Sequence, residues 1–429
     1  MARFMPEIKT TEELAALQLE GLKWTVNHAY HGSDFYRRKL DAAGVKPEDI
    51  KSLADLPRLP MTMAHELQGD YPFPLRAVSH DRIVRIHASS GTTGKRKVFC
   101  YTAKDLEDWT YFFARCYEMA GLTVEDRVQI AVGYGLWTAG TGFQAGCERY
   151  GAMAIPIGPG NVDLQCEFLV DFQSTVLCCT ASMGLLLAER VEAEKLRDKI
   201  NLKKVIFGSE RSSQAMRDRI KVLLGVEHLF DIPGMTELYG PGTGLDCLKH
   251  EGIHYWADYY ILEIIDPETL QPAPEGETGE MVVTTLRKEA APLIRYRTRD
   301  LTRLIPQLCS CGSVLPMHGP LLGRTDDMII FRAVNIYPGQ IDHVLSRVAG
   351  VGSEYQIHLE RKDDGKDYMT VTVERAKQGD PADDGNLIKA VSTGIKKQAM
   401  VSADVRIVNY GDLPRSERKS KRVFDHRPD

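Results

Sequence analysis

The chain has 429 residues, of which 43% are hydrophobic and 26% are charged, and its formal net charge is −5. This composition is typical of a globular chain of two or three domains, and the acidic balance argues against a basic surface for nucleic acid. The nine cysteines are odd in number and lie mostly in apolar segments, which argues against a disulfide framework. Neither a signal-peptide core nor an apolar run of membrane-spanning length occurs, so we expect a cytoplasmic protein.

The first predicted elements are helices and a strand pair. Residues 10–30 carry apolar side chains at helical spacing after a TTEE start, which predicts a capped helix. Residues 81–88 (DRIVRIHA) alternate as a half-buried strand, and the extended segment VFCY follows a short loop. Thr102 and Asp105 have the spacing of a capping box for a long helix through Leu122.

Apolar runs and helical segments alternate in the middle of the chain. The runs VQIAVGYG, GAMAIPIG, STVLCCT and KKVIFGSE predict strands, and CEFLVDFQ, GLLLAERVEAEKL and AMRDRIKVLL predict helices. This alternation predicts wound α/β layers around a parallel sheet. After Gly252, the segments IHYWADYYILEIIDPE and GEMVVTTL predict a β-rich subdomain.

The last hundred residues predict a separate small domain. They contain three strand-like runs, YQIHLERK, YMTVTVE and ADVRIVNY, and a helix at residues 385–399. We therefore expect an α/β protein with a large domain at residues 1–326 and a small C-terminal α+β domain at residues 327–429.

The segment HASSGTTGKRK, residues 87–97, separates the predicted strand from VFCY. A loop of this composition is either a plain turn or a phosphate site, because backbone N–H groups, hydroxyls and a nearby lysine can all face an anion. It is not a Walker A motif, since only two residues separate Gly91 from Gly94 and Lys95.

The segment SSGTTGK resembles the phosphate loop of the acyl-adenylating superfamily. Four further segments resemble that superfamily in the same order along nearly the whole chain: PGMTELYG (233–240), YRTRDLT (296–302), GRTDDMIIFRAVNIYPGQID (323–342) and PRSERKSKRV (414–423). Within the superfamily, HASSGTTGK, GYGLWTAG, GSERSS, ELYGPG, DPETL and VNIYPGQID resemble the phenylacetate–CoA ligases and their relatives. This resemblance implies a large AMP-binding domain, a mobile C-terminal domain, and the use of ATP, Mg²⁺ and coenzyme A.

The resemblance also implies roles for individual residues in nucleotide binding. Glu237 would hold Mg²⁺, and Thr236 would contact the α-phosphate. Asp300 would bind the ribose hydroxyls and Arg324 the nucleotide, whereas Asp300 taken alone would pair with a neighbouring arginine. Glu210 would contact the adenine, with a plain surface charge as the alternative. The loop would hold the phosphates through Ser90, Gly91, Thr92, Thr93, Gly94 and Lys95.

The C-terminal segments carry the expected catalytic cation and hinge. The resemblance implies that Lys419 bridges the carboxylate and the α-phosphate and that the domain rotates about Asp326. Arg418 stands where the family has glycine, which leaves Lys421 as an alternative catalytic lysine. Pro233 stands where many members have the aromatic residue that stacks on adenine.

The expected reaction joins an aryl acid, with phenylacetate as the first candidate, to CoA through an acyl-adenylate, releasing AMP and pyrophosphate. By the resemblance, Tyr134 and Trp137 would line the acid pocket, with plain core packing as the alternative. Two other functions stay open: adenylation without CoA transfer, as in deazaflavin-adenylating synthetases, and a degenerate nucleotide-binding protein. The expected partners are the small molecules alone, with no membrane and no nucleic acid, and a homodimer is one expected oligomer.

A second site is predicted from cysteine and histidine spacing. Cys309 and Cys311 form a Cys-x-Cys-Gly sequence, which is typical of metal-binding turns. Cys247 and His254, in LDCLKHEGIH, would complete a tetrahedral set that favours Zn²⁺. Four protein ligands would make this zinc structural, and the alternative is a group of reduced thiols beside ordinary histidines.

Overall fold

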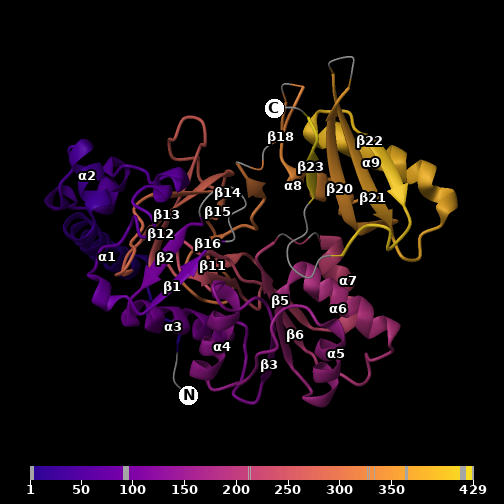
Figure 1. Cartoon of the computed structure of the whole chain (residues 1–429), viewed down its shortest axis with the longest axis horizontal. Helices are drawn as coiled ribbons and strands as arrows, with labels where there is room; N and C mark the ends of the chain where they lie inside the picture. The colour runs from indigo at the N-terminus through magenta and orange to yellow at the C-terminus, as the bar shows by residue number, and fades with distance from the viewer. Residues whose placement is uncertain are drawn as a thin grey trace.

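A computed structural model describes most of the chain (Figure 1). The described residues are 4–89, 96–210, 212, 214–325, 327, 329–332, 334–362, 366–415 and 422–427.

Five parallel strands form the central sheet of the large domain: β3 (Arg127–Ala131), β4 (Met153–Ile155), β5 (Val176–Thr180), β6 (Lys204–Gly208) and β7 (His228–Asp231). Their order in the sheet is β4-β3-β5-β6-β7. The strands β3, β5 and β6 are buried along most of their length, as expected for a sheet covered on both faces. Four helices alternate with the strands: α4 (Thr138–Tyr150), α5 (Val162–Asp171), α6 (Ala181–Ala193) and α7 (Gln214–Leu224). The predicted wound α/β layers are confirmed.

Three further helices and a hairpin precede this sheet: α1 (Thr11–Gly32), α2 (Asp34–Ala42), α3 (Ala103–Met119), β1 (Arg85–Ala88) and β2 (Val98–Tyr101). The predicted capping box is confirmed, because Thr102 and Asp105 each accept a hydrogen bond from the other's backbone N–H. The strand predicted from residue 81 begins only at Arg85, because His80–Arg82 form a 3₁₀ turn.

The predicted β-rich subdomain consists of two antiparallel four-stranded sheets. One has the order β10 (Gly244–Asp246), β11 (Ile253–Tyr255), β16 (Met317–His318) and β15 (Leu304–Ile305). The other has the order β12 (Tyr260–Ile265), β13 (Gly279–Thr285), β14 (Tyr296–Thr302) and β17 (Gly323–Arg324). A short ladder of β8 (Gly234–Met235) and β9 (Gly240–Pro241) precedes them.

The C-terminal domain has its own sheet and its own core. Its sheet has the order β22 (Asp404–Val408), β21 (Asp367–Arg375), β20 (Val351–Arg361) and β23 (Val423–Asp425). The helices α8 (Pro338–Leu345) and α9 (Asp384–Ala399) and the hairpin β18 (Ile329–Phe331) and β19 (Val334–Ile336) complete it. Ile357, Val371 and Val391 are fully buried in a cluster separate from those of the large domain. Figure 1 shows this domain, in orange and yellow, beside α6 and α7.

Among the described residues, no helix has both the length and the apolar character needed to span a membrane.

Candidate active site and metal centre

The predicted phosphate loop connects the two strands of the β1–β2 hairpin. The N–H of Ser89 donates to the Lys97 carbonyl at 2.9 Å, which extends the hairpin pairing to the base of the loop. The N–H of Ala88 donates to the Leu136 carbonyl at 3.2 Å, so the loop base is joined to the segment after β3. The residues from Ser90 to Lys95 lie outside the described residues, and their predicted contacts stay predictions.

Lys97 connects the loop base to the predicted Mg²⁺ ligand. Its ammonium contacts Oε1 of Glu237, and its Nζ lies 3.4 Å from the Tyr296 hydroxyl. The Tyr296 hydroxyl donates to the same Glu237 oxygen at 3.0 Å. Three segments distant in the sequence therefore meet at one carboxylate: the hairpin, the loop between β8 and β9, and β14.

The charge state of Glu237 follows from these contacts. Its side chain is only 9% exposed, and burial alone would raise the pKa of the carboxyl. The ion pair with Lys97 and the hydrogen bond from Tyr296 act against burial, and the pKa of Glu237 falls below its usual value. The site therefore holds an ionised carboxylate at neutral pH.

A buried lysine holds the backbone of this acidic segment. Nζ of Lys288 donates to the carbonyl of Glu237 at 2.8 Å and to that of Leu238. The side chain is fully buried, and burial lowers the pKa of Lys288 to about 8. The ammonium lies 4.9–5.4 Å from the ring centroids of Phe99, Tyr101 and Tyr239. The Tyr101 hydroxyl in turn donates to the Thr236 carbonyl at 3.3 Å.

The two residues predicted to hold the nucleoside lie together. Asp300 on β14 accepts from Nη1 of Arg324 on β17 at 3.4 Å. Arg297, a neighbouring candidate partner of Asp300, pairs instead with the buried carboxylate of Glu280 at 2.6 Å. The strand β14 helps to place both carboxylates: Asp300 lies on this strand, and Tyr296 at its start contacts Glu237.

Glu210, the predicted adenine contact, lies at the N-terminus of α6. Its carboxylate accepts from the backbone N–H of Ser182 at 2.5 Å and from the Ser182 hydroxyl at 2.9 Å. A carboxylate in this position stabilises the first turn of a helix. The described contacts of Glu210 therefore give it a structural role at the start of α6.

Tyr134 and Trp137 lie on the loop between β3 and α4. The Tyr134 ring packs closely on Gly140, where an added Cβ would lie 2.5 Å from the ring. The Tyr134 hydroxyl is buried and has no hydrogen-bond partner among the described residues. The Trp137 ring lies 5.2 Å from the guanidinium carbon of Arg96, which follows the phosphate loop. Of the two predicted acid-pocket residues, Trp137 thus borders the loop base.

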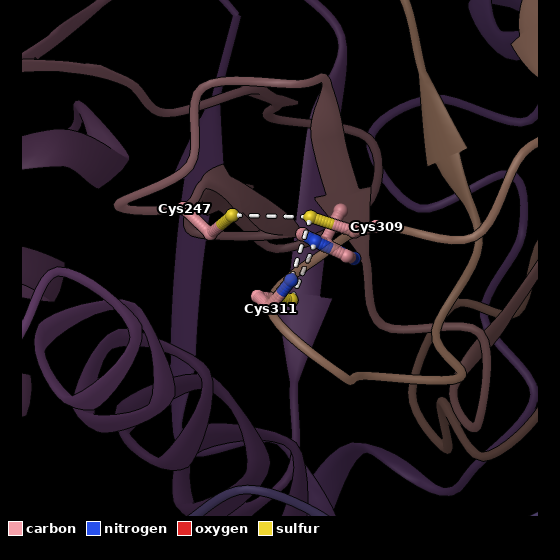
Figure 2. Close-up of side chains that lie close together, drawn as sticks. Cys247, Cys309 and Cys311 are labelled. Carbon is pink, nitrogen blue, oxygen red and sulfur yellow. Dashed lines mark hydrogen bonds between the residues drawn. The ribbon is translucent and has the colours of Figure 1, made fainter.

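The four predicted metal ligands come together at the β10–β11–β16–β15 sheet. One ligand atom from each of Cys247, His254, Cys309 and Cys311 lies within 4.8 Å of the others. The Sγ atoms of Cys247 and Cys309 are 3.5 Å apart, and Nε2 of His254 is 3.5 Å from Sγ of Cys311. Figure 2 shows the Cys247 and Cys309 thiols pointing toward each other, with Cys311 close by.

The surroundings of the four side chains suit a bound cation. Backbone N–H groups donate to two of the sulfurs, from Lys249 to Cys247 at 3.4 Å and from Cys311 to Cys309 at 3.5 Å. Burial raises the pKa of the Cys247 and Cys309 thiols, and these two N–H donors act against that rise. Nδ1 of His254 lies 2.9 Å from the Leu315 carbonyl, which fixes the ring and directs Nε2 toward the sulfurs.

His250, another histidine of the segment LDCLKHEGIH, lies outside this group. Its ring pairs with Asp246 at 2.6 Å and lies 3.1 Å from the His228 ring.

Comparison with known proteins identifies the family of the chain. The profile of AMP-binding enzymes matches residues 10–286, and that of the AMP-binding enzyme C-terminal domain matches residues 333–427. The phenylacetate-coenzyme A ligase of Escherichia coli (strain K12) is 40% identical over 427 residues, which are 98% of this chain and 97% of that protein. The chain belongs to the phenylacetate–CoA ligase family of AMP-binding enzymes.

Two solved structures of one related ligase differ in how closely they resemble this chain. The 2-hydroxyisobutyryl-CoA ligase in the postadenylation state with R3-HIB-AMP has a TM-score of 0.89 and 26% identity, covering 99% of this chain and 95% of that one. The same ligase with 2-HIB-AMP and CoA in the thioesterification state has a TM-score of 0.71 and 28% identity, covering 97% and 91%. Of these two structures, the one in the postadenylation state is the more similar to the present structure.

The site residues taken from the family resemblance stay predictions, and sequence reasoning missed three residues that the structure places around Glu237. Lys97 lies only two positions beyond Lys95, in the same motif, but its pairing with Glu237 depends on tertiary packing. Tyr296 begins the YRTRDLT segment that was used for Asp300 alone. Lys288, in TTLRKEAAP, had no sequence feature to mark it. The predicted hinge Asp326 and the lysines Lys419 and Lys421 lie outside the described residues.

Proposed function

We propose that the chain is an AMP-forming aryl-acid–CoA ligase, with phenylacetate as the expected acid. It joins ATP and the carboxylate to an acyl-adenylate and pyrophosphate, and then transfers the acyl group to CoA with release of AMP. The observation that carries this proposal is the 40% sequence identity to a phenylacetate-coenzyme A ligase over 98% of this chain. The convergence of Lys97, Glu237 and Tyr296 at the loop base supports it.

Adenylation brings a carboxylate and a triphosphate together, so the site must neutralise negative charge. The Glu237 carboxylate is ionised and buried, which suits a hard cation with oxygen ligands. When bound there, Mg²⁺ would neutralise phosphate oxygens. Lys97 lies beside the same carboxylate and adds a second positive charge, and Lys288 holds the backbone that carries Glu237.

The remaining nucleotide contacts are proposals from the motif positions. The residues from Ser90 to Lys95 cradle the phosphates, Thr236 contacts the α-phosphate, and Glu210 borders the adenine. Asp300 accepts from the ribose hydroxyls, with Arg324 holding its carboxylate at 3.4 Å. Lys419 supplies the catalytic cation, and rotation about Asp326, at the proposed boundary between residues 326 and 327, moves it.

For the acid pocket, we propose Tyr134 and Trp137. A buried hydroxyl without a partner is costly, so the Tyr134 hydroxyl requires a ligand or water as acceptor or donor. The aromatic rings supply the apolar surface that an aryl acid needs.

Two half-reactions distinguish the proposed ligase from its alternatives. A panel of aryl acids is incubated with ATP and Mg²⁺, with and without CoA, and pyrophosphate and thioester are measured. The proposed ligase releases pyrophosphate with phenylacetate and forms a thioester when CoA is added. Pyrophosphate without any thioester supports adenylation alone, and neither product supports the degenerate nucleotide-binding protein.

We also propose that Cys247, His254, Cys309 and Cys311 hold a structural Zn²⁺. The mixed sulfur and nitrogen donors suit zinc, and four protein ligands leave no open position for substrate. A homodimeric state and a cytoplasmic location stay predictions.

A further inference from the structure

Two arginines flank the part of the chain that carries the expected catalytic lysine. Arg415 precedes residues 416–421 and Arg422 follows them. We call residues 416–421 the lysine segment, because it contains both candidate lysines, Lys419 and Lys421. Each arginine pairs with a buried glutamate of the C-terminal sheet. The residues on either side of the lysine segment are therefore held by contacts of the same kind.

Arg422 is bound to strand β20 through its side chain and its backbone. Its Nη1 donates to Oε2 of Glu354 at 2.6 Å and to the Tyr355 carbonyl at 3.2 Å. Its Nη2 lies 3.3 Å from Oε1 of Glu354, and its guanidinium carbon lies 4.8 Å from the centroid of the Tyr355 ring. The Ile357 N–H donates to the Arg422 carbonyl at 2.7 Å, which extends the pairing of β20 with β23 (Figure 1).

Arg415 is bound in the same way to the neighbouring strand, β21. Its Nη1 and Nη2 donate to the two oxygens of Glu374 at 2.7 and 2.8 Å. The Leu413 N–H donates to the same carboxylate at 2.8 Å, so Glu374 also binds the chain just before Arg415. Arg415 has a further contact outside its domain, where its Nε lies 3.6 Å from Oε2 of Glu189 on α6.

The burial of the two glutamates makes these ion pairs hard to break. The side chain of Glu354 is 5% exposed and that of Glu374 is 1% exposed. A buried carboxylate that loses its partner keeps an uncompensated charge, and the penalty is larger than for an exposed pair. Because β20 and β21 are paired along their length, both flanks of the lysine segment are tied to one two-stranded ladder.

We propose that Glu354 and Arg422, together with Glu374 and Arg415, position the catalytic lysine for adenylation. They are positioning residues, because each acts through the lysine segment and not through contact with the substrate. A cation stabilises the charge that builds between carboxylate and phosphate only when it is correctly placed. Fixed flanks reduce the conformational freedom that the lysine must lose to reach that place. This proposal rests on the proposed adenylating activity.

The substitution Glu354→Gln tests the positioning role. It keeps the side-chain shape and removes the charge that pairs with Arg422, whose described contacts all lie within its own domain. With saturating ATP and phenylacetate, pyrophosphate release should fall about tenfold to a hundredfold, as expected for a displaced catalytic group. The apparent KM values for ATP and phenylacetate should change less than about twofold, because the pair binds neither substrate. Thioester formation from preformed acyl-adenylate should be unchanged.

The matched control is Asp384→Asn in the same domain. Asp384 on α9 makes a two-pronged ion pair with Arg375, with both contacts at 2.7 Å. Among the described residues, it contacts neither Arg415 nor Arg422. This control should lower the melting temperature and change pyrophosphate release by less than about twofold. Arg422→Lys is a second test variant that keeps the charge but not the two-pronged geometry, so it should show a smaller loss of the same kind as Glu354→Gln.

A double-mutant cycle distinguishes positioning of the lysine from a general loss of structure. In Lys419→Arg the cation is already displaced, so adding Glu354→Gln should cost less pyrophosphate release there than in wild type. If Lys421 is the catalytic lysine, this smaller cost should occur in Lys421→Arg instead, and the positioning role is supported equally.

Three results would overturn the positioning role. They are an equal cost of Glu354→Gln in wild type and in both lysine variants, an equal loss in both half-reactions, and unchanged pyrophosphate release in both Glu354→Gln and Arg422→Lys. A wild-type chain that releases no pyrophosphate with any aryl acid would overturn the proposed function instead.

Discussion

At the scale of single residues, Lys97 determines the charge of the predicted Mg²⁺ ligand. Without its ammonium, burial would raise the pKa of Glu237 with less to oppose it. In Lys97→Met we expect the apparent KM for Mg²⁺-ATP to rise about tenfold and the acid limb of the pH profile to move to higher pH. Lys104→Met is the control, since Lys104 pairs with Asp108 on α3. An unchanged acid limb would remove Lys97 from this role.

The buried Lys288 leads to a prediction of how the free energy of unfolding depends on pH. Burial lowers its pKa from 10.5 to about 8, so the unfolded chain binds more protons than the folded chain between these values. The contribution of Lys288 to the free energy of unfolding therefore rises with pH in this window. Between about pH 8 and pH 10, we expect wild type to gain about 2 kcal/mol relative to Lys288→Met. Urea denaturation at several pH values measures this difference, and a constant difference contradicts the lowered pKa.

At the scale of elements, helix α4 is one that the sequence did not predict. Its segment TAGTGFQAGCERY contains three glycines, which lower helix propensity, and we predicted no helix there. Glycines are required in α4 because this helix packs closely against α3. A Cβ at Gly142 would lie 2.3 Å from the Phe113 ring, and one at Gly146 would lie 2.1 Å from Cβ of Phe113. The close approach of α3 and α4 therefore explains the composition.

This packing predicts opposite effects for two glycine substitutions in helices. Gly146→Ala should lower the free energy of unfolding by about 1–3 kcal/mol, because the added methyl group forces the helices apart. A Cβ at Gly385 in α9 would have no atom within 4 Å. Gly385→Ala should therefore raise the free energy of unfolding by about 0.5–1 kcal/mol, because alanine has the higher helix propensity. Denaturant melts of both variants check the pair. A stabilising Gly146→Ala would show that α3 and α4 are not in close contact.

The metal centre is an element-scale feature that stays a prediction, and the structure brings its four proposed ligands within 4.8 Å of one another. Purified protein should contain about one Zn²⁺ per chain, as a closed four-ligand site requires. Cys309→Ser with Cys311→Ser should lower both the zinc content and the melting temperature. A chelator should lower the melting temperature of wild type and leave that of the double variant unchanged. Zinc-free protein of full stability would reject the site.

At the scale of the whole molecule, the sequence predicted the layers and the order of the site segments better than their contacts. The apolar runs identified β3 to β6 because a parallel sheet is buried on both faces. The strand β7 was missed, since HLFD is short and half-buried. The pairing of Lys97 with Glu237 spans 140 positions, and it depends on how the hairpin packs on the β-rich sheets. Such contacts arise only from tertiary structure.

The central claim is that the chain joins an aryl acid to CoA through an adenylate. Mass spectrometry of a reaction containing phenylacetate, ATP, Mg²⁺ and CoA tests it most directly. The account predicts phenylacetyl-CoA and AMP in equal amounts, with pyrophosphate as the third product. Formation of ADP and phosphate, or of an adenylate that never yields a thioester with phenylacetate or any other aryl acid, would contradict it.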